Sequence, residues 1–190
     1  MVESSPYKKV GVFLDRDGTI DVEVGYLNSP KQLRLIPKSA KAIKLLNDKN
    51  IPVIVTTNQS GISRGYFTKE TLEKIHNKLI KLLAKENAYV DAIYYCAHFP
   101  DFKCLCRKPK LGMFNKGVKN FKLSPKKCYI VGDKASDVEF GKNAKAKSIL
   151  VLTGYGKDER KVLTTKPDYI ANDLYQTVKW ILKDIEKNNG

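Results

Sequence analysis

Short apolar runs alternate along this chain with longer stretches in which apolar residues recur at helical spacing. The longer stretches predict helices that begin at Pro37 and Thr68, one at about 113–122, and a last one at about 174–186. The short runs are rich in β-branched residues, which is typical of buried strands, and they lie at 10–14, 51–55, 92–95, 128–131 and 148–152. Strands that alternate with helices predict an α/β fold, in which helices cover both faces of a parallel sheet. We expect a single domain over residues 1–190.

The composition narrows the class of protein. The chain has 190 residues, of which 42% are hydrophobic, and this is enough for a domain with a real core. No stretch approaches the roughly 20 apolar residues of a membrane span. The first residues lack the basic region and apolar segment of a signal peptide. We therefore expect a soluble cytoplasmic protein with no membrane partner, and we take it to be a monomer.

The charge of the chain bears on its partners. A formal net charge of +15 raises nucleic acid as a possible ligand. The positive residues are mostly lysines spread over the whole sequence, and in 69–86 they alternate with apolar residues, as on a solvated helix face. This pattern does not favour nucleic-acid binding. A positive surface field also suits an anionic small molecule.

Polar residues follow the predicted strands at corresponding points. Asp15 and Asp17 come directly after the first run, Thr57 ends the second, Asp133 follows the fourth, and Lys108 lies between the third and fourth. Each has an ordinary explanation as a turn, a solvated charge or a helix cap. A parallel sheet nevertheless brings these positions to one edge, where ligands bind. Two close carboxylates repel each other, so the pattern predicts a Mg²⁺ site, a carboxylate nucleophile with an acid–base partner, or both.

A second group of residues can bind a metal. Cys96, His98, Cys104 and Cys106 lie within eleven residues, and three thiolates with one imidazole form the usual ligand set of a structural zinc site. A disulfide is the alternative, but a cytoplasmic chain would rarely keep one. Catalytic zinc is less favoured because four protein ligands leave no open position. Cys128 begins a predicted strand and is interpreted as a core residue.

The ordered motifs resemble those of the haloacid dehalogenase-like (HAD) phosphohydrolases. They are Asp15-Arg16-Asp17-Gly18-Thr19, Thr57, Lys108 and Gly132-Asp133 with Asp137, within residues 10 to about 155. The resemblance implies a three-layer α/β/α fold with a central parallel sheet. It also implies phosphoryl transfer through an aspartyl-phosphate.

The same resemblance implies roles for individual residues. Asp15 would be the nucleophile, and Asp17 would act first as acid and then as base. Thr57 and Lys108 would contact the phosphoryl group. The ligands of Mg²⁺ would be the carboxylates of Asp15 and Asp133 and the backbone carbonyl of Asp17. Asp137 has three open roles: contact with a metal-bound water, pairing with Lys134, or capping of the next helix.

The zinc loop (residues 96–106) and the segment 106–113 that follows it resemble one branch of these phosphatases. That branch contains the heptose bisphosphate phosphatases and the histidinol-phosphate phosphatases. The loop would place Arg107 and Lys108 over the site. The spacings from residue 19 to 57 and from 57 to 107 are filled by predicted core elements, so we expect no large cap domain.

The substrate implied by this branch remains a choice. Segments 21–26 and 57–65 resemble the heptose enzymes, whereas the five residues between His98 and Cys104 are a spacing shared with the histidinol-type enzymes. Arg64 and Arg107 offer planar donors for a second phosphate, which favours a sugar bisphosphate. The further predicted substrate contacts are Asn58, Gln59 and Lys134.

The prediction is therefore removal of the 7-phosphate of D-glycero-D-manno-heptose 1,7-bisphosphate. Hydrolysis of histidinol phosphate is the alternative, and a polynucleotide 3′-phosphatase is less favoured. A zinc-stabilised binding module is a non-enzymatic alternative, but such a module has no need of carboxylates that repel phosphate.

Overall fold

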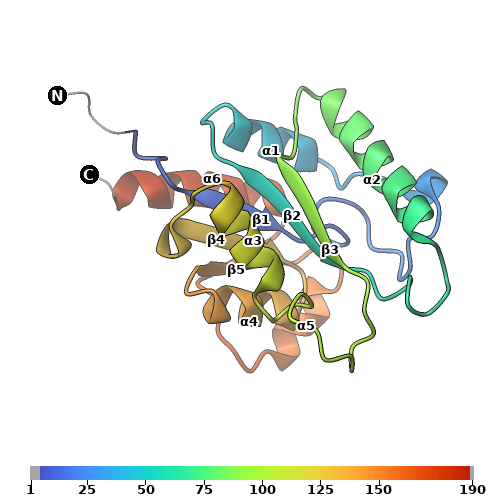
Figure 1. The fold of residues 1–190 in the computed structure, drawn as a ribbon. Coiled ribbons are helices and arrows are strands. Elements are labelled where there is room, and N and C mark those ends of the chain that lie inside the picture. Colours follow the sequence, from blue (N-terminus) through green and yellow to red (C-terminus); the bar gives the residue numbers. More distant parts are fainter. Residues whose placement is uncertain (1–4, 189–190) are drawn as a thin grey trace.

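The computed structural model describes residues 5–188 and places one parallel sheet at the centre of the molecule (Figure 1). Its strands run in the order β3-β2-β1-β4-β5-β6. Their bounds are β1 Gly11–Leu14, β2 Val53–Asn58, β3 Ala92–Cys96, β4 Cys128–Gly132, β5 Lys147–Val151 and β6 Tyr169–Ala171. All the pairings are parallel, so each connection must cross over the sheet.

Helices cover both faces of this sheet, which confirms the predicted three-layer α/β/α fold. They are α1 Ser39–Asn47, α2 Lys69–Ala84, α3 Gly112–Asn120, α4 Ala135–Asn143, α5 Gly156–Val162 and α6 Leu174–Lys187, with short 3₁₀ turns at Pro30–Gln32 and Pro125–Lys127. Side chains alternate along a strand. Val12 and Leu14 of β1 therefore join the core beneath α1, α2 and α6. Phe13 points to the other face and packs on Phe114 of α3.

Some elements differ from the sequence prediction. The helix expected from Pro37 begins at Ser39, because Lys38 has a left-handed backbone with φ of 67°. Strand β6 and helix α5 were not predicted, and α4 was anticipated only as the helix that Asp137 could cap, without bounds. Strand β6 has only three residues and α5 only seven, too few for a hydrophobic period to be recognised.

The site is positioned by the point at which the strand order reverses. From β1 the chain goes to β2 on one side, and β4 lies on the other side of β1. The loops that leave the carboxyl ends of adjacent strands diverge at such a point and leave a crevice between them. Loops at this edge surround the crevice. Residues 5–188 contain no large cap domain, as predicted. Among the described helices, none has the length and apolar character needed to span a bilayer.

Candidate active site

A buried ion-pair network lies at the carboxyl end of β1. The Lys108 Nζ is 2.9 Å from Asp15 Oδ1 and 2.6 Å from Asp137 Oδ1, and all three side chains are buried. Burial alone would lower the pKa of Lys108, but the carboxylates of Asp137 and Asp15 raise it. The lysine therefore stays charged, and it holds two segments that are far apart in sequence against the first strand.

Three carboxylates at this position fit a divalent cation. Oxygens of Asp15, Asp133 and Asp137 lie within 4.8 Å of one another. Burial raises the pKa of Asp133 to about 8, and the charges of Asp15 and Asp137 add to the effect. One Asp133 oxygen accepts from the Tyr155 N–H at 2.8 Å, whereas its Oδ1 is buried without a hydrogen-bond partner in the described part of the chain. A hard cation bound by oxygens would satisfy that atom and relieve the repulsion.

The position of Asp137 narrows the roles left open for it. Its Oδ1 accepts from Lys108 and its Oδ2 accepts from the backbone N–H of Lys134 at 3.2 Å. Asp137 therefore pairs with Lys108 and caps the start of α4. The side chain of Lys134 pairs instead with Glu23, at 3.1 Å.

A glycine lets the loop after β1 close over Asp133. Gly18 has φ of +76°, in the left-handed region. A Cβ at this residue would lie 2.1 Å from Asp133 Oδ2, which is too close for any side chain. The glycine of the Asp-x-Asp-Gly motif thus has a steric reason in this structure, because the backbone at Gly18 must pass directly beside the carboxylate of Asp133.

Asp17 lies apart from the three clustered carboxylates. The Arg16 Nη2 donates to both of its oxygens, at 2.7 and 2.8 Å, and Gln59 Nε2 donates to Oδ2 at 2.9 Å. Gln59 Nε2 also donates to the hydroxyl of Thr57, at 2.8 Å. Burial would raise the pKa of Asp17, but the adjacent Arg16 charge lowers it overall. The amide of Gln59 thus links Asp17, in the loop after β1, to Thr57 of β2.

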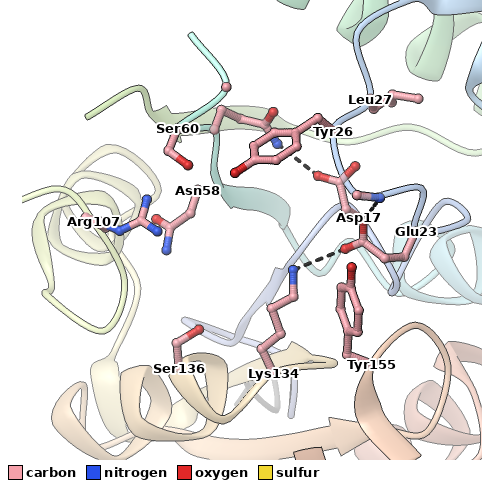
Figure 2. A pocket seen from close by; sticks show the side chains of 13 residues that line it. Asp17, Glu23, Tyr26, Leu27, Asn58, Ser60, Arg107, Lys134, Ser136 and Tyr155 are labelled. Carbon is pink, nitrogen blue, oxygen red and sulfur yellow. Dashed lines mark hydrogen bonds and ion pairs between the residues drawn. The ribbon is translucent and has the colours of Figure 1, made fainter. Parts of the chain in front are cut away.

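A cavity of about 300 Å³ opens above these residues (Figure 2). Four of the predicted substrate contacts line it: Asn58, Gln59, Arg107 and Lys134. Figure 2 shows Arg107 and Lys134 approaching the same space from different loops. The cavity therefore combines two cations with amide groups above the buried network.

Arg64 is not among the residues that line this cavity. Its guanidinium lies 5.5 Å from the centre of the Phe99 ring, so it contacts the zinc loop instead. The prediction that it binds substrate stays a prediction. Asn58 has a second place in the site, because its side chain exchanges two hydrogen bonds with the backbone of Lys108, at 3.1 and 3.2 Å.

Sequence reasoning did not assign several residues that line the cavity, among them Glu23, Tyr26, Ser136 and Tyr155. Tyr155 lies just beyond β5, at the same sheet edge as the predicted residues, so the rule of strand ends could have found it. Tyr26 does not follow a strand end, and its segment, residues 21–26, was noted only for its resemblance to the heptose enzymes. It belongs to an irregular loop, and its edge-on contact with Tyr66, at 4.7 Å between ring centres, depends on the fold.

The four predicted zinc ligands are brought together by the loop between β3 and α3. Their ligand atoms lie within 4.8 Å of one another. The Sγ of Cys96 is 3.1 Å from that of Cys106 and 3.8 Å from that of Cys104, and His98 Nδ1 is 3.3 Å from Cys106 Sγ. The edge of a tetrahedron with Zn–S bonds of about 2.3 Å is roughly 3.8 Å. The donor set fits zinc, and all four cysteines of the chain are free thiols.

Comparisons with known proteins agree with this geometry. A HAD-hydrolase-like family model matches residues 105–177. The D-glycero-β-D-manno-heptose-1,7-bisphosphate 7-phosphatase of Haemophilus ducreyi is 37% identical, over 91% of this chain and 98% of its own. The chain belongs to the heptose-bisphosphate phosphatase family. A second member of this family, from Thermosynechococcus vestitus, is also 37% identical, over 90% of this chain and 94% of its own.

A solved structure supports the same assignment. The D,D-heptose 1,7-bisphosphate phosphatase of B. bronchiseptica, complexed with magnesium and phosphate, superposes with a TM-score of 0.87. It is 32% identical, and the match covers 92% of this chain and 99% of that one. The resemblance read from the motifs is therefore confirmed. Membership of this family also confirms the prediction of a phosphoric monoester hydrolase.

Proposed function

We propose that this enzyme removes the 7-phosphate of D-glycero-D-manno-heptose 1,7-bisphosphate through an aspartyl-phosphate on Asp15. The buried contact of Asp15 with Lys108, beneath a cavity lined by cations, carries the proposal. A carboxylate held in this way is fixed in position and lies beside a positive charge that can stabilise a transferring phosphoryl group. The names of the relatives support the choice of substrate.

In the first step a carboxylate oxygen of Asp15 attacks phosphorus, and the bond from phosphorus to the oxygen on C7 breaks. Asp17 protonates that departing oxygen. Because the Arg16 charge lowers the pKa of Asp17, the carboxyl must take up this proton when the anionic substrate is bound. Lys108 and the hydroxyl of Thr57 stabilise the charge on the phosphoryl oxygens. Asp15 Oδ1 accepts from Lys108 and from the backbone N–H of Arg16, at 2.9 and 2.8 Å, and these bonds hold that oxygen in place.

In the second step water hydrolyses the aspartyl-phosphate. Asp17, now ionised, takes a proton from the water as its oxygen attacks phosphorus. The bond between phosphorus and Asp15 breaks, inorganic phosphate leaves, and both aspartates return to their starting protonation states. The same residue acts as acid and then as base, so its carboxyl must reach both the sugar oxygen and the water.

Two metals complete the proposal. The carboxylates of Asp15 and Asp133 and the backbone carbonyl of Asp17 would hold Mg²⁺. The carboxylate of Asp137 lies within 4.8 Å of the other two carboxylates. When bound, Mg²⁺ neutralises negative charge at the phosphoryl group. Zinc would have a structural role at Cys96, His98, Cys104 and Cys106, because a closed four-ligand set leaves no position for a reacting water.

The second phosphate of the substrate would bind away from the reacting centre. Arg107 and Lys134 line the cavity and are the cations that suit it, and Asn58 and Gln59 offer amide groups for the sugar hydroxyls. Lys134 already pairs with Glu23, so a monophosphate that carries a cationic amine would leave Arg107 without an anionic partner.

A substrate panel tests the proposal. Phosphate release is measured from heptose 1,7-bisphosphate, fructose 1,6-bisphosphate, histidinol phosphate and a 3′-phosphorylated oligonucleotide. We expect the highest kcat/KM for the heptose bisphosphate, with the 7-phosphate lost. A higher value for histidinol phosphate or the oligonucleotide would overturn the substrate assignment but leave the chemistry in place.

A metal experiment tests the cofactors separately. Brief treatment with EDTA should stop turnover. Elemental analysis of the treated enzyme verifies that zinc is retained. Mg²⁺ alone should then restore turnover, because an all-oxygen ligand set suits a hard cation. Recovery that requires added Zn²⁺ instead would contradict the assignment.

A further inference from the structure

Arg16 lies between the two proposed catalytic aspartates, and its side chain is completely buried. A buried guanidinium is costly unless its N–H groups find partners. Its Nη2 donates to both oxygens of Asp17, and its Nε faces Asp21 Oδ2 at 3.7 Å, too far for a hydrogen bond. Arg16 cannot reach solvent, so its position is set by the few side chains around it.

His76 completes this environment from a different element. It projects from α2 and is buried, with Nε2 3.3 Å from Arg16 Nη1. Its ring packs against Tyr95 of β3, at 6.0 Å between ring centres. Burial and the charge of Arg16 lower the pKa of His76 to about 4, so the imidazole is neutral at pH 7 and Nε2 is free to accept a hydrogen bond.

The geometry points to His76 as a positioning residue, which acts through Arg16 on the carboxyl of Asp17. This inference rests on the proposed role of Asp17 in proton transfer. His76 holds one end of the guanidinium, and the other end holds Asp17. Neither Arg16 nor His76 lines the cavity, so neither is expected to touch substrate.

The contacts also indicate which oxygen of Asp17 transfers the proton. A carboxylate has about four lone-pair positions. Oδ2 accepts from Arg16 and Gln59, and Oδ1 accepts from Arg16 alone among the described residues. The remaining position belongs to Oδ1, on a side chain that lines the cavity. A rotation of the guanidinium would turn this oxygen away from the substrate.

The test compares substrates that differ in their need for an acid. An alkoxide leaves poorly without a proton, whereas 4-nitrophenolate leaves without one. In His76→Leu, single-turnover cleavage of heptose bisphosphate should fall by about 10- to 100-fold, the loss expected of a small misplacement. KM should change little. The first-turnover release of 4-nitrophenol from 4-nitrophenyl phosphate should keep its wild-type rate, because that step does not use Asp17.

Three further variants separate positioning from stability. His76→Gln keeps an acceptor near Nε2 and should recover most of the lost rate, and Arg16→Lys, which keeps the charge but loses the second donor group, should reproduce the Leu pattern. Leu79→Val, in the core face of the same helix, should lower the melting temperature but leave the ratio of the two substrates unchanged.

Clear results would overturn the inference. Equal losses for both substrates in His76→Leu, no loss at all, or no difference between the Leu and Gln variants would each show that His76 is structural only. Wild-type enzyme that does not cleave heptose bisphosphate would contradict the proposed function instead. In that case fructose 1,6-bisphosphate, which also has alkoxide leaving groups, replaces the heptose bisphosphate in the comparison with 4-nitrophenyl phosphate.

Discussion

At the scale of one residue, the proposed nucleophile, Asp15, is held by its contact with the buried Lys108. Asp15→Asn keeps the shape of the side chain, and Lys108 remains paired with Asp137. The fold should survive, and turnover should fall by at least about a thousandfold, because an amide cannot form the acyl phosphate. Phosphate release and the melting temperature measure the two effects. Asp48→Asn, at an exposed partner of Lys44, is the matched control and should keep full activity. Near-wild-type turnover in Asp15→Asn would contradict the proposed aspartyl-phosphate mechanism.

The second phosphate should depend on one of the two arginines considered for it. Arg107 lines the cavity, whereas Arg64 lies over Phe99. Arg107→Ala should raise KM for heptose bisphosphate by about tenfold, the effect of one charge-assisted hydrogen bond, and should affect a monophosphate less. Arg64→Ala should change KM less than Arg107→Ala does. Equal effects of Arg107→Ala on both substrates would place this arginine on the reacting phosphate.

The buried histidine gives a pH dependence of stability. The folded protein holds His76 with a pKa lowered from 6.5 to about 4 by burial and by Arg16. Between these values the unfolded chain binds the proton and the folded chain does not. The contribution of neutral His76 is therefore complete above pH 6.5 and is lost as the pH falls towards 4.

Urea unfolding measures this effect. From pH 7 to pH 5 the free energy of unfolding should fall more in the wild type than in His76→Gln, which has no group titrating in that range at residue 76. The other histidine, His98, and the zinc site proposed for it are the same in both proteins, so their contribution cancels in the difference. If the free energy of unfolding falls equally with pH in both proteins, His76 is not held neutral by the fold.

The sequence predicted individual residues well where a rule of geometry applies. The ends of parallel strands share one edge, so Asp15, Thr57 and Asp133 could be placed together before the structure was known. The partners of Arg16 could not be predicted, because His76 lies on a distant helix with an ordinary amphipathic pattern. A contact of this kind depends on the packing of α2 against the sheet, which no local spacing encodes.

At the scale of elements, the strands flanked by clear helical periods were predicted within a few residues. Short elements were missed because α5 and β6 are fixed by their neighbours: β6 pairs with β5, and Asp168, next to it, accepts from the Ser148 N–H at 2.8 Å. Such elements gain their stability from tertiary contacts, and little of it comes from local propensity.

The zinc loop is an element with no hydrophobic core of its own. Residues 97–111 contain no described helix or strand, and Phe99, Phe102 and Leu105 are 43%, 54% and 82% exposed. The proposed metal ligation would then contribute much of the order of this loop. Cys104→Ser should lose the zinc, lower the melting temperature by at least about 5 °C and weaken phosphate binding through Arg107 and Lys108.

Elemental analysis of purified protein measures the metal, with one Zn²⁺ per chain expected in the wild type. Cys128→Ala is the matched control. Cys128 is the first residue of β4, and its side chain is buried in the core with Phe13 and Phe114. Its loss should also lower the melting temperature, but the zinc content should stay the same. Full zinc content in Cys104→Ser would contradict the ligand assignment.

At the scale of the whole molecule, the protein carries a net charge of +15 and is proposed to bind a bisphosphate in its cavity. A positive field raises the local concentration of anions and speeds their encounter with the site. Salt screens this field, over about 10 Å at 0.1 M ionic strength. The kcat/KM for heptose bisphosphate should therefore fall as sodium chloride is added, while kcat stays nearly constant because bound substrate no longer depends on encounter.

A monophosphate, with about half the charge, should show a shallower slope of kcat/KM against salt concentration. Initial rates over a range of salt concentrations give both slopes, with Mg²⁺ kept saturating. Equal slopes for the two substrates would mean that the lysine-rich surface contributes to solubility alone and does not guide the substrate to the site.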